Sequence, residues 1–202
     1  AETYQAVAAG PGWGDGHENQ LLEIVGSGLP VVLDADAIRT FARVVAEHRI
    51  HGTAHGPMVL TPHPGELHAM LEELHMSLLA QETGPGGSPE SFIDALKRAA
   101  AALEAVIVYK SHVTWIVDGR EASSLPIVVD VMNNALGVAG SGDVLTGIIG
   151  SLLAQGYDPF QAAHNGVLIH QRAGVEARSA SGWFDAETLI AHVGTICRQA
   201  EE

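Results

Sequence analysis

The sequence predicts an α/β fold built from βαβ units around a parallel, buried sheet. Short apolar runs alternate with longer segments in which apolar residues recur at helical spacing, and this alternation is typical of such units. Strands of a parallel sheet are covered on both faces and therefore read as unbroken apolar runs, as Pro30–Leu33 does. The 202 residues are 47% hydrophobic, which is enough apolar material for one large core. We expect a single domain over residues 1–202.

The expected elements follow one another closely, and helix-capping residues mark several of their ends. Ser88 and Asp158 each precede a proline, which is typical of an N-cap followed by the first helical residue. Asp185 is expected to cap the last helix. In chain order we expect strand Tyr4–Ala9, helix His17–Gly26, strand Pro30–Leu33, helix Ala37–His48, strand Met58–Leu60, a helix carrying His68 and His75, helix Pro89–Leu103, strand Ala105–Tyr109, a hairpin of Trp115–Val117 with Ile127–Val131, a helix ending at Gly156, a helix from Pro159, and helix Ala186–Gln199.

Charge and cysteine content exclude several classes of function. The formal net charge is −14 and only two residues are lysine, so the chain should repel a nucleic-acid backbone. To bind an anionic small molecule, the chain would need a local group that attracts negative charge, such as a helix N-terminus, glycine N–H groups, a metal ion or one well-placed lysine. The lone Cys197 allows no intrachain disulfide, and no run is long enough to cross a membrane. We expect a cytoplasmic protein.

The stretch Asn133–Gly156 carries the strongest signal for chemistry. Gly137, Gly140 and Gly142 precede an apolar helical pattern, so several backbone N–H groups can converge on an anion at the start of that helix. Asp143 follows at once, where it could accept a proton from a hydroxyl group that attacks a phosphoryl group. Alternatively, Asp143 is an acidic residue favoured by the helix dipole and the glycines form an ordinary loop. The glycine spacing favours phosphate chemistry.

Other candidate groups stand where predicted strands end, because open parallel sheets bind ligands outside the carboxyl ends of their strands. Gly12 and Gly14 lie in a loop that either approaches a ligand or makes a tight connection. Asp34 and Asp36 could hold Mg²⁺ or a hydroxyl group, or one of them could cap the next helix. These alternatives have equal weight.

Two groups of histidines have different interpretations. Prolines on both sides of His63 hold its imidazole in a rigid turn before a helix, which favours ligand recognition over an exposed turn residue. His51 and His55 are four residues apart, but the glycines around them argue against a shared metal site. We expect both to be solvated.

Lys110 is one of the two lysines and follows the strand Ala105–Tyr109, among the hydrogen-bonding residues Ser111, His112 and Thr114. It is a candidate contact for a phosphate or a nucleotide, and a solvated lysine at a strand end is the alternative.

Five motifs in order resemble those of one known family. They are Gly10-Pro11-Gly12-Trp13-Gly14, Leu33-Asp34-Ala35-Asp36-Ala37, Leu60-Thr61-Pro62-His63-Pro64-Gly65-Glu66, Lys110 with Thr114, and Ala139-Gly140-Ser141-Gly142-Asp143-Val144-Leu145-Thr146-Gly147. Together they resemble the ADP/ATP-dependent NAD(P)H-hydrate dehydratases of the ribokinase-like superfamily. The resemblance implies a three-layer α/β/α fold with a mostly parallel central sheet.

It also implies a lyase that repairs NADHX and NADPHX, the hydrated forms of NADH and NADPH. Such enzymes phosphorylate the ring hydroxyl of the S epimer with ADP or ATP, in the presence of Mg²⁺, and then eliminate phosphate. Asp143 would be the catalytic base, and Gly12, Gly14, His63 and Asp143 would contact the substrate. The implied nucleotide-binding residues are Lys110, Ser111, His112, Val113, Thr114, Gly140 and Gly142.

The chain matches the family without its first strand, helix and substrate loop. A ribokinase-like sheet without them would expose an apolar edge. We therefore expect a homo-oligomer, for which the family precedent is a tetramer, or a second chain that supplies the missing strands. A truncated protein that only binds nucleotide and a kinase of a small alcohol, such as a vitamin precursor, are the alternative functions.

Overall fold

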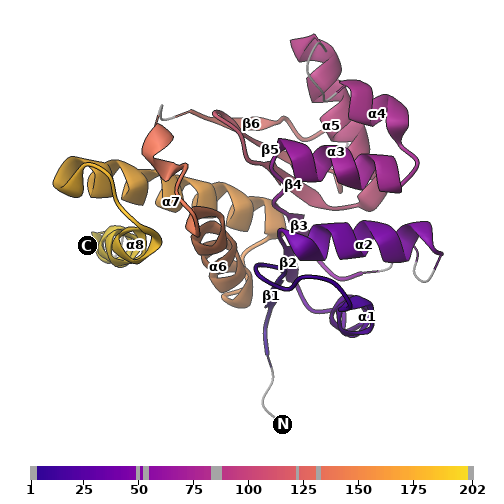
Figure 1. The fold of residues 1–202 in the computed structure, drawn as a ribbon, viewed down its shortest axis with the longest axis horizontal. Coiled ribbons are helices and arrows are strands. Elements are labelled where there is room, and N and C mark those ends of the chain that lie inside the picture. Colours follow the sequence, from indigo (N-terminus) through magenta and orange to yellow (C-terminus); the bar gives the residue numbers. More distant parts are fainter. Residues whose placement is uncertain are drawn as a thin grey trace.

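The computed structural model describes residues 4–48, 51, 55–82, 88–121, 123–130 and 133–199. These residues form a six-stranded sheet between layers of helices (Figure 1). The strands lie side by side in chain order: β1 (Val7–Ala9), β2 (Val31–Leu33), β3 (Met58–Leu60), β4 (Val106–Tyr109), β5 (Thr114–Asp118) and β6 (Ile127–Val129). The strands β1 to β4 are parallel, whereas β5 is antiparallel to both of its neighbours. The mostly parallel sheet is therefore confirmed.

The helices account for most of the remaining described residues. They are α1 (Glu18–Gly26), α2 (Asp36–Ala46), α3 (Pro64–Glu73), α4 (Ser77–Glu82), α5 (Pro89–Leu103), the 3₁₀ turn η1 (Asn134–Leu136), α6 (Ser141–Ala154), α7 (Pro159–Ser181) and α8 (Ala186–Gln199). No described helix combines the length and the hydropathy needed to cross a bilayer.

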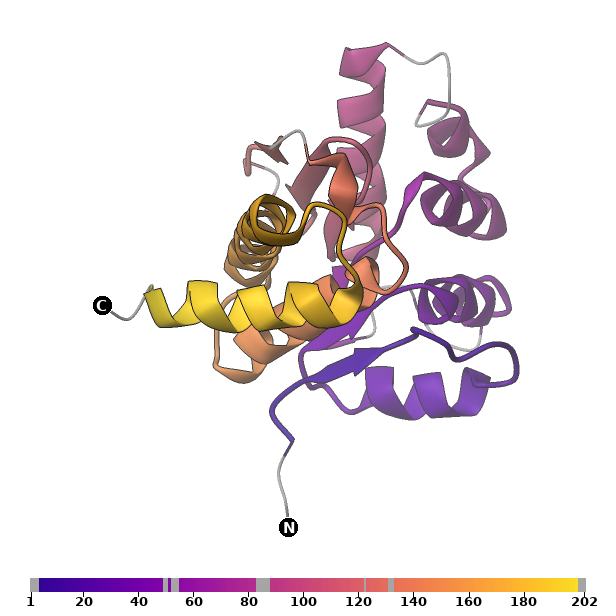
Figure 2. The same cartoon turned by 60° about the vertical axis from the view of Figure 1, so that its left-hand side comes forward.

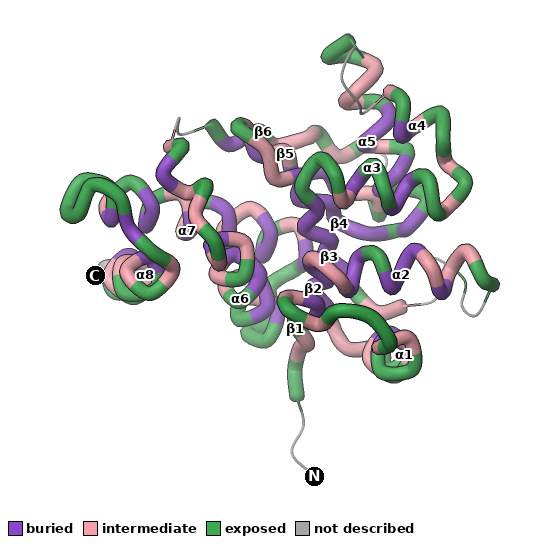
Figure 3. Tube along the Cα trace, in the orientation of Figure 1, coloured by how far each residue is buried: buried purple, intermediate pink, exposed green. Residues whose placement is uncertain are grey.

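Alternate strand residues divide the core into two layers, because successive side chains of a strand point to opposite faces of the sheet. Leu33 and Leu60 pack with helices α1 to α5, whereas Val32 and Val59 pack with α6 and α7. The buried sheet runs between these layers (Figure 3). The last helix, α8, packs against α7 and α6 through a separate apolar cluster (Figure 2). The result is the expected three-layer α/β/α arrangement.

The predicted helix caps are present. The hydroxyl of Ser88 accepts the N–H of Ser91 at 3.2 Å, and Asp158 accepts the N–H of Phe160 at 2.9 Å. Asp185 accepts the N–H of Thr188 at 2.9 Å, before α8. The predicted hairpin is also confirmed, because β5 pairs with β6, although its expected end at Val131 lies outside the described residues.

Two local predictions were wrong. His75 does not continue a helix from Pro64, because it adopts a φ of 59° in the turn between α3 and α4. His55 is not solvated, because its half-buried ring lies near Phe41 and its Nε2 is 2.8 Å from the carbonyl oxygen of Leu103. This carbonyl is in the last turn of α5, where carbonyl groups have no N–H donor within the helix. The imidazole can donate a hydrogen bond to it.

Candidate active site

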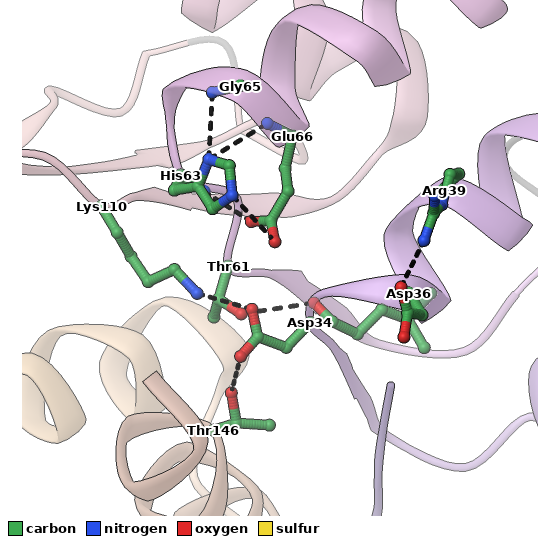
Figure 4. Close-up of polar contacts among 10 residues, drawn as sticks. Asp34, Asp36, Arg39, Thr61, His63, Gly65, Glu66, Lys110 and Thr146 are labelled. Carbon is green, nitrogen blue, oxygen red and sulfur yellow. Dashed lines mark hydrogen bonds and ion pairs between the residues drawn. The ribbon is translucent and has the colours of Figure 1, made fainter. Parts of the chain in front are cut away.

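The carboxyl ends of β2, β3 and β4 meet the N-terminus of α6 at one edge of the sheet. Asp34 follows β2, His63 comes shortly after β3, and Lys110 follows β4 (Figure 4). This is the edge at which open α/β sheets bind ligands.

Asp34 is the buried centre of this edge. It is 2% exposed, and its Oδ1 accepts a hydrogen bond from Lys110 Nζ at 2.6 Å. Its Oδ2 accepts the hydroxyl of Thr146, on α6, at 2.8 Å. Both carboxylate oxygens therefore have protein partners, and the side chain neither caps α2 nor faces outward as an open metal ligand. Asp34 therefore fixes the ammonium group of Lys110 and, through Thr146, the second turn of α6.

Asp36, two residues later, contacts different groups from those that Asp34 contacts. Its Oδ2 accepts the N–H of Gly14 at 2.8 Å, and the carboxylate also pairs with Arg39. The hydrogen bond from Gly14 is the main cause that lowers the pKa of Asp36, and Arg39 adds to it. Between the two aspartates, Ala35 adopts the strained φ of 47°, which sends their side chains to different partners. Asp36 therefore anchors the glycine loop.

The loop that carries Gly12 and Gly14 passes close to Asp34. At Gly10 the φ is 122°, and a Cβ there would lie 1.8 Å from the carbonyl oxygen of Asp34. Only glycine fits at this position. Gly12 and Gly14 are exposed and line neither of the two cavities described below.

The N-terminus of α6 approaches Lys110 closely. Gly140 is the N-cap with a φ of 83°, and Ser141, Gly142 and Asp143 form the first turn, whose N–H groups have no acceptor within the helix. A Cβ on Gly142 would lie 3.3 Å from Lys110 Nζ and 3.7 Å from Asp34 Oδ2. The ammonium group of Lys110, paired with Asp34, therefore lies beside the positive end of the helix dipole of α6.

The first cavity, of about 840 Å³, opens beside this arrangement. Of the predicted nucleotide-binding residues, Lys110, Ser111, His112, Thr114 and Gly142 line it, whereas Val113 and Gly140 do not. His63 also lines this cavity. Its Nδ1 accepts the N–H of Gly65 at 3.0 Å and caps α3, so the structure gives His63 a structural role as well as a place at the cavity.

Asp143 and Gly140 face a different space. They line a second cavity, of about 590 Å³, between α6 and α8, whose other lining residues are mostly apolar. The start of α6 thus separates the two cavities, with Ser141 and Gly142 on one side and Asp143 on the other. Asp143 is exposed at this position. Further along α6, a Cβ on Gly150 would lie 3.2 Å from that of Ala8, whereas a Cβ on Gly147 would meet nothing within 4 Å.

His170 and Ser141 were not predicted as site residues. Nε2 of His170, on α7, lies 2.9 Å from the carbonyl oxygen of Ser141 and 3.1 Å from its hydroxyl. Burial is the main cause that lowers the pKa of His170 to about 4, and the nearby charge of Lys110 adds to it. The sequence does contain a signal, because His170 continues the apolar face of α7 at helical spacing from Ala163 and Val167.

Comparison with known proteins decides the family. The family model described as NAD(P)H-hydrate dehydratase matches residues 1–194. The chain belongs to the NAD(P)H-hydrate dehydratase family. An ADP-dependent (S)-NAD(P)H-hydrate dehydratase of Neisseria meningitidis is 36% identical over 154 residues, which are 76% of this chain and 47% of that protein. In four curated relatives, that protein included, the match to this chain covers between 30% and 61% of the relative's own length.

Solved structures agree with this membership. The ADP/ATP-dependent NAD(P)H-hydrate dehydratase of Bacillus subtilis, co-crystallised with ATP and Mg²⁺ and soaked with CoA, aligns with a TM-score of 0.76 at 28% identity. The alignment covers 98% of this chain and 67% of that one. A ribokinase-like superfamily protein of Enterococcus faecalis, at 20% identity and a TM-score of 0.68, covers 96% of this chain and 63% of its own. The second likeness shows the ribokinase-like fold.

Proposed function

We propose that this chain catalyses the nucleotide-dependent dehydration of S-NADHX and S-NADPHX, with ADP or ATP as the phosphoryl donor. Membership of the dehydratase family supports the reaction class.

One observation carries the proposal. Lys110, held by the buried Asp34, stands against Gly142 at the start of α6, in the wall of the cavity of about 840 Å³. Phosphoryl transfer needs positioning and charge stabilisation more than covalent chemistry from the protein. The N–H of Ser141 donates to the carbonyl oxygen of Val138 at 3.2 Å, so the N–H groups of Gly142 and Asp143 are the ones that would act beside the ammonium group, and together they supply both.

The nucleotide would occupy the first cavity, where Lys110 and Gly142 would hold its terminal phosphates. Ser111, His112 and Thr114 would contact the rest of the nucleotide. Val113 and Gly140 adjoin lining residues in the chain, and their backbone groups would contribute to the nucleotide site.

Asp143 would act as the base, with the ring hydroxyl group lying over the start of α6, between the Asp143 carboxylate and the terminal phosphate of the nucleotide. The ring hydroxyl oxygen forms a bond to the terminal phosphorus, the bond from that phosphorus to the nucleotide oxygen breaks, and the hydroxyl proton passes to Asp143. The carbon–oxygen bond to the new phosphate then breaks and inorganic phosphate leaves, while the neighbouring ring carbon loses a proton to water, which restores the ring double bond. Gly12, Gly14 and His63 would hold the hydrated cofactor.

Mg²⁺ would enter with the nucleotide. The described residues contain no group of three or more His, Cys, Asp or Glu side chains that could hold a metal ion. Mg²⁺ is commonly held by substrate phosphates with one or two carboxylates, and Asp130 is a carboxylate residue in the cavity lining. When bound, the ion would neutralise charge on the phosphates.

We also propose that the active protein is a homo-oligomer in which another polypeptide segment lies along β1. No strand pairs with the outer edge of β1 among the described residues, and the apolar second cavity lies on α6, which contacts β1. Light scattering coupled to size exclusion tests this, and a fully active monomer would contradict it.

The test of the activity is the rise in near-ultraviolet absorbance when NADHX becomes NADH. Purified protein receives NADHX and Mg²⁺ with ADP or with ATP, beside the Asp143→Asn variant. We expect a nucleotide-dependent rise that the variant lacks. Accumulation of a stable phosphate ester of an added alcohol, without a rise from NADHX, would instead identify a small-alcohol kinase. Nucleotide binding with neither product would identify a non-catalytic protein.

A further inference from the structure

His170 ties α7 to the first residue of α6. Its Nε2 lies 2.9 Å from the carbonyl oxygen of Ser141, and the two side chains are 6% and 4% exposed. Ser141 immediately precedes Gly142, so the contact is made within the turn that approaches Lys110.

The chemistry of the contact fixes which nitrogen carries the proton. A carbonyl oxygen can only accept, so Nε2 must donate to Ser141. Burial keeps the imidazole neutral near pH 7, because it lowers the pKa of His170 to about 4. A neutral ring has one N–H, and Nδ1 therefore carries a lone pair.

The backbone of the first turn of α6 is flexible enough that a hydrogen bond from another helix would help to fix it. Glycines stand on both sides of Ser141, at Gly140 and Gly142, and they restrict the backbone less than any other residue. The hydrogen bond from Thr146 to Asp34 holds only the following turn. His170 therefore supplies this hydrogen bond at the residue where the helix begins.

We propose that His170 is a positioning residue for phosphoryl transfer. Its Nε2–H holds Ser141 so that the N–H groups of Gly142 and Asp143 remain directed at the transferring phosphoryl group. The inference rests on the proposed function, since it assigns the transfer to this turn. Displacements of about 1 Å in such a site can cost about 100-fold in rate.

The test compares two replacements of His170 with a matched control. His170→Gln keeps an N–H donor near the position of Nε2, whereas His170→Leu removes the donor and keeps an apolar side chain. His164→Leu makes the same change on the same helix at a residue that does not line the first cavity. Melting curves establish that each variant is folded at the assay temperature.

We expect His170→Leu to lower kcat by about 10- to 100-fold while KM for the nucleotide changes less than about threefold. His170→Gln should recover most of the loss, and His164→Leu should behave as the unmodified chain. Equal losses in the Gln and Leu variants would overturn the role of the donor. An unchanged kcat in folded His170→Leu would show that the contact contributes only to packing, and the positioning role would be wrong.

NMR separates this inference from the proposed activity. The imidazole nitrogen signals should show the proton on Nε2, and MgATP should shift the amides of Gly142 and Asp143, less so in His170→Leu. If these results hold but NADHX is not converted, the dehydratase proposal fails and the positioning role stands. A proton on Nδ1, or no amide shift with MgATP in the unmodified chain, would overturn the positioning role itself.

Discussion

Lys110 reaches Asp34 across the edge of the sheet, with its Nζ 2.6 Å from Oδ1, and the pair joins β4 to β2 beside the first turn of α6. The Asp34 side chain is 2% exposed and that of Lys110 is 21% exposed. The carboxylate is thus buried at the end of a strand, and it determines where the ammonium group can stand. Asp34 places the charge that the proposed phosphoryl transfer needs.

Replacing Lys110 with Met should destabilise the fold as well as the site. The change leaves the Asp34 carboxylate buried with Thr146 as its remaining side-chain partner, and removing one member of a buried ion pair costs about 3–5 kcal/mol. Urea unfolding at neutral pH measures the loss. Lys110→Met combined with Asp34→Asn removes both charges and should recover part of the stability. If the double variant is the less stable of the two, the stranded charge is not the cause.

The sequence predicts this site only in part, for a physical reason. Apolar runs, caps and glycine spacing are local signals, and they placed the strands, the start of α6 and Lys110 correctly. The partners of Asp34 are 76 and 112 residues away in the chain, and no local pattern encodes such a pairing. The role of Asp34 is therefore determined by the fold, which brings β2, β4 and α6 together.

The same limit applies to the division between the cavities. Gly140, Gly142 and Asp143 are adjacent in the sequence, and the sequence suggested one anion site for all of them. A helix turns about 100° per residue, so adjacent residues of its first turn face different directions. In the structure Gly142 lines one cavity and Asp143 the other.

Gly142→Ala should reduce nucleotide-dependent activity with little loss of stability. The new methyl group would lie 3.3 Å from Lys110 Nζ, so it would displace the flexible end of that side chain from the start of α6. We expect a loss of about 10- to 100-fold in kcat, since misplacement of a transition-state contact acts on the chemical step.

The matched control is Gly194→Ala, in α8, where a new methyl group would meet nothing within 4 Å. It should keep full activity and gain up to about 1 kcal/mol, because alanine is the better helix former. Wild-type kinetics for Gly142→Ala would show that the approach of Lys110 to α6 is unimportant.

Arg120 links the end of β5 to the start of α7 by an ion pair with Asp158. Its Nη1 lies 2.9 Å from Asp158 Oδ2, and Arg120 is the main cause that lowers the pKa of Asp158 below 3.8. A lowered pKa contributes stability above about pH 4, and the contribution disappears as the pH falls through the folded-state pKa.

Asp158→Asn keeps the helix cap but removes the charge, since Asn caps as well as Asp. The side chain of Asp158 is 47% exposed, so we expect a loss of no more than about 1 kcal/mol at pH 7. The difference from the unmodified chain, measured by urea unfolding, should shrink towards pH 3. A difference independent of pH would mean that the ion pair is not responsible.

His170 should make stability fall with acidity in a higher pH range. Its pKa is lowered from 6.5 to about 4, so between these values the unfolded chain binds a proton that the folded chain does not. Stability is therefore complete above about pH 6.5 and falls as the pH decreases towards 4, by a total on the order of 3 kcal/mol. His170→Gln cannot titrate and lacks this component. Urea unfolding of both proteins from pH 7 to pH 4.5 should show the stability difference moving steadily in favour of the variant, and parallel curves would mean that His170 is not buried in its neutral form.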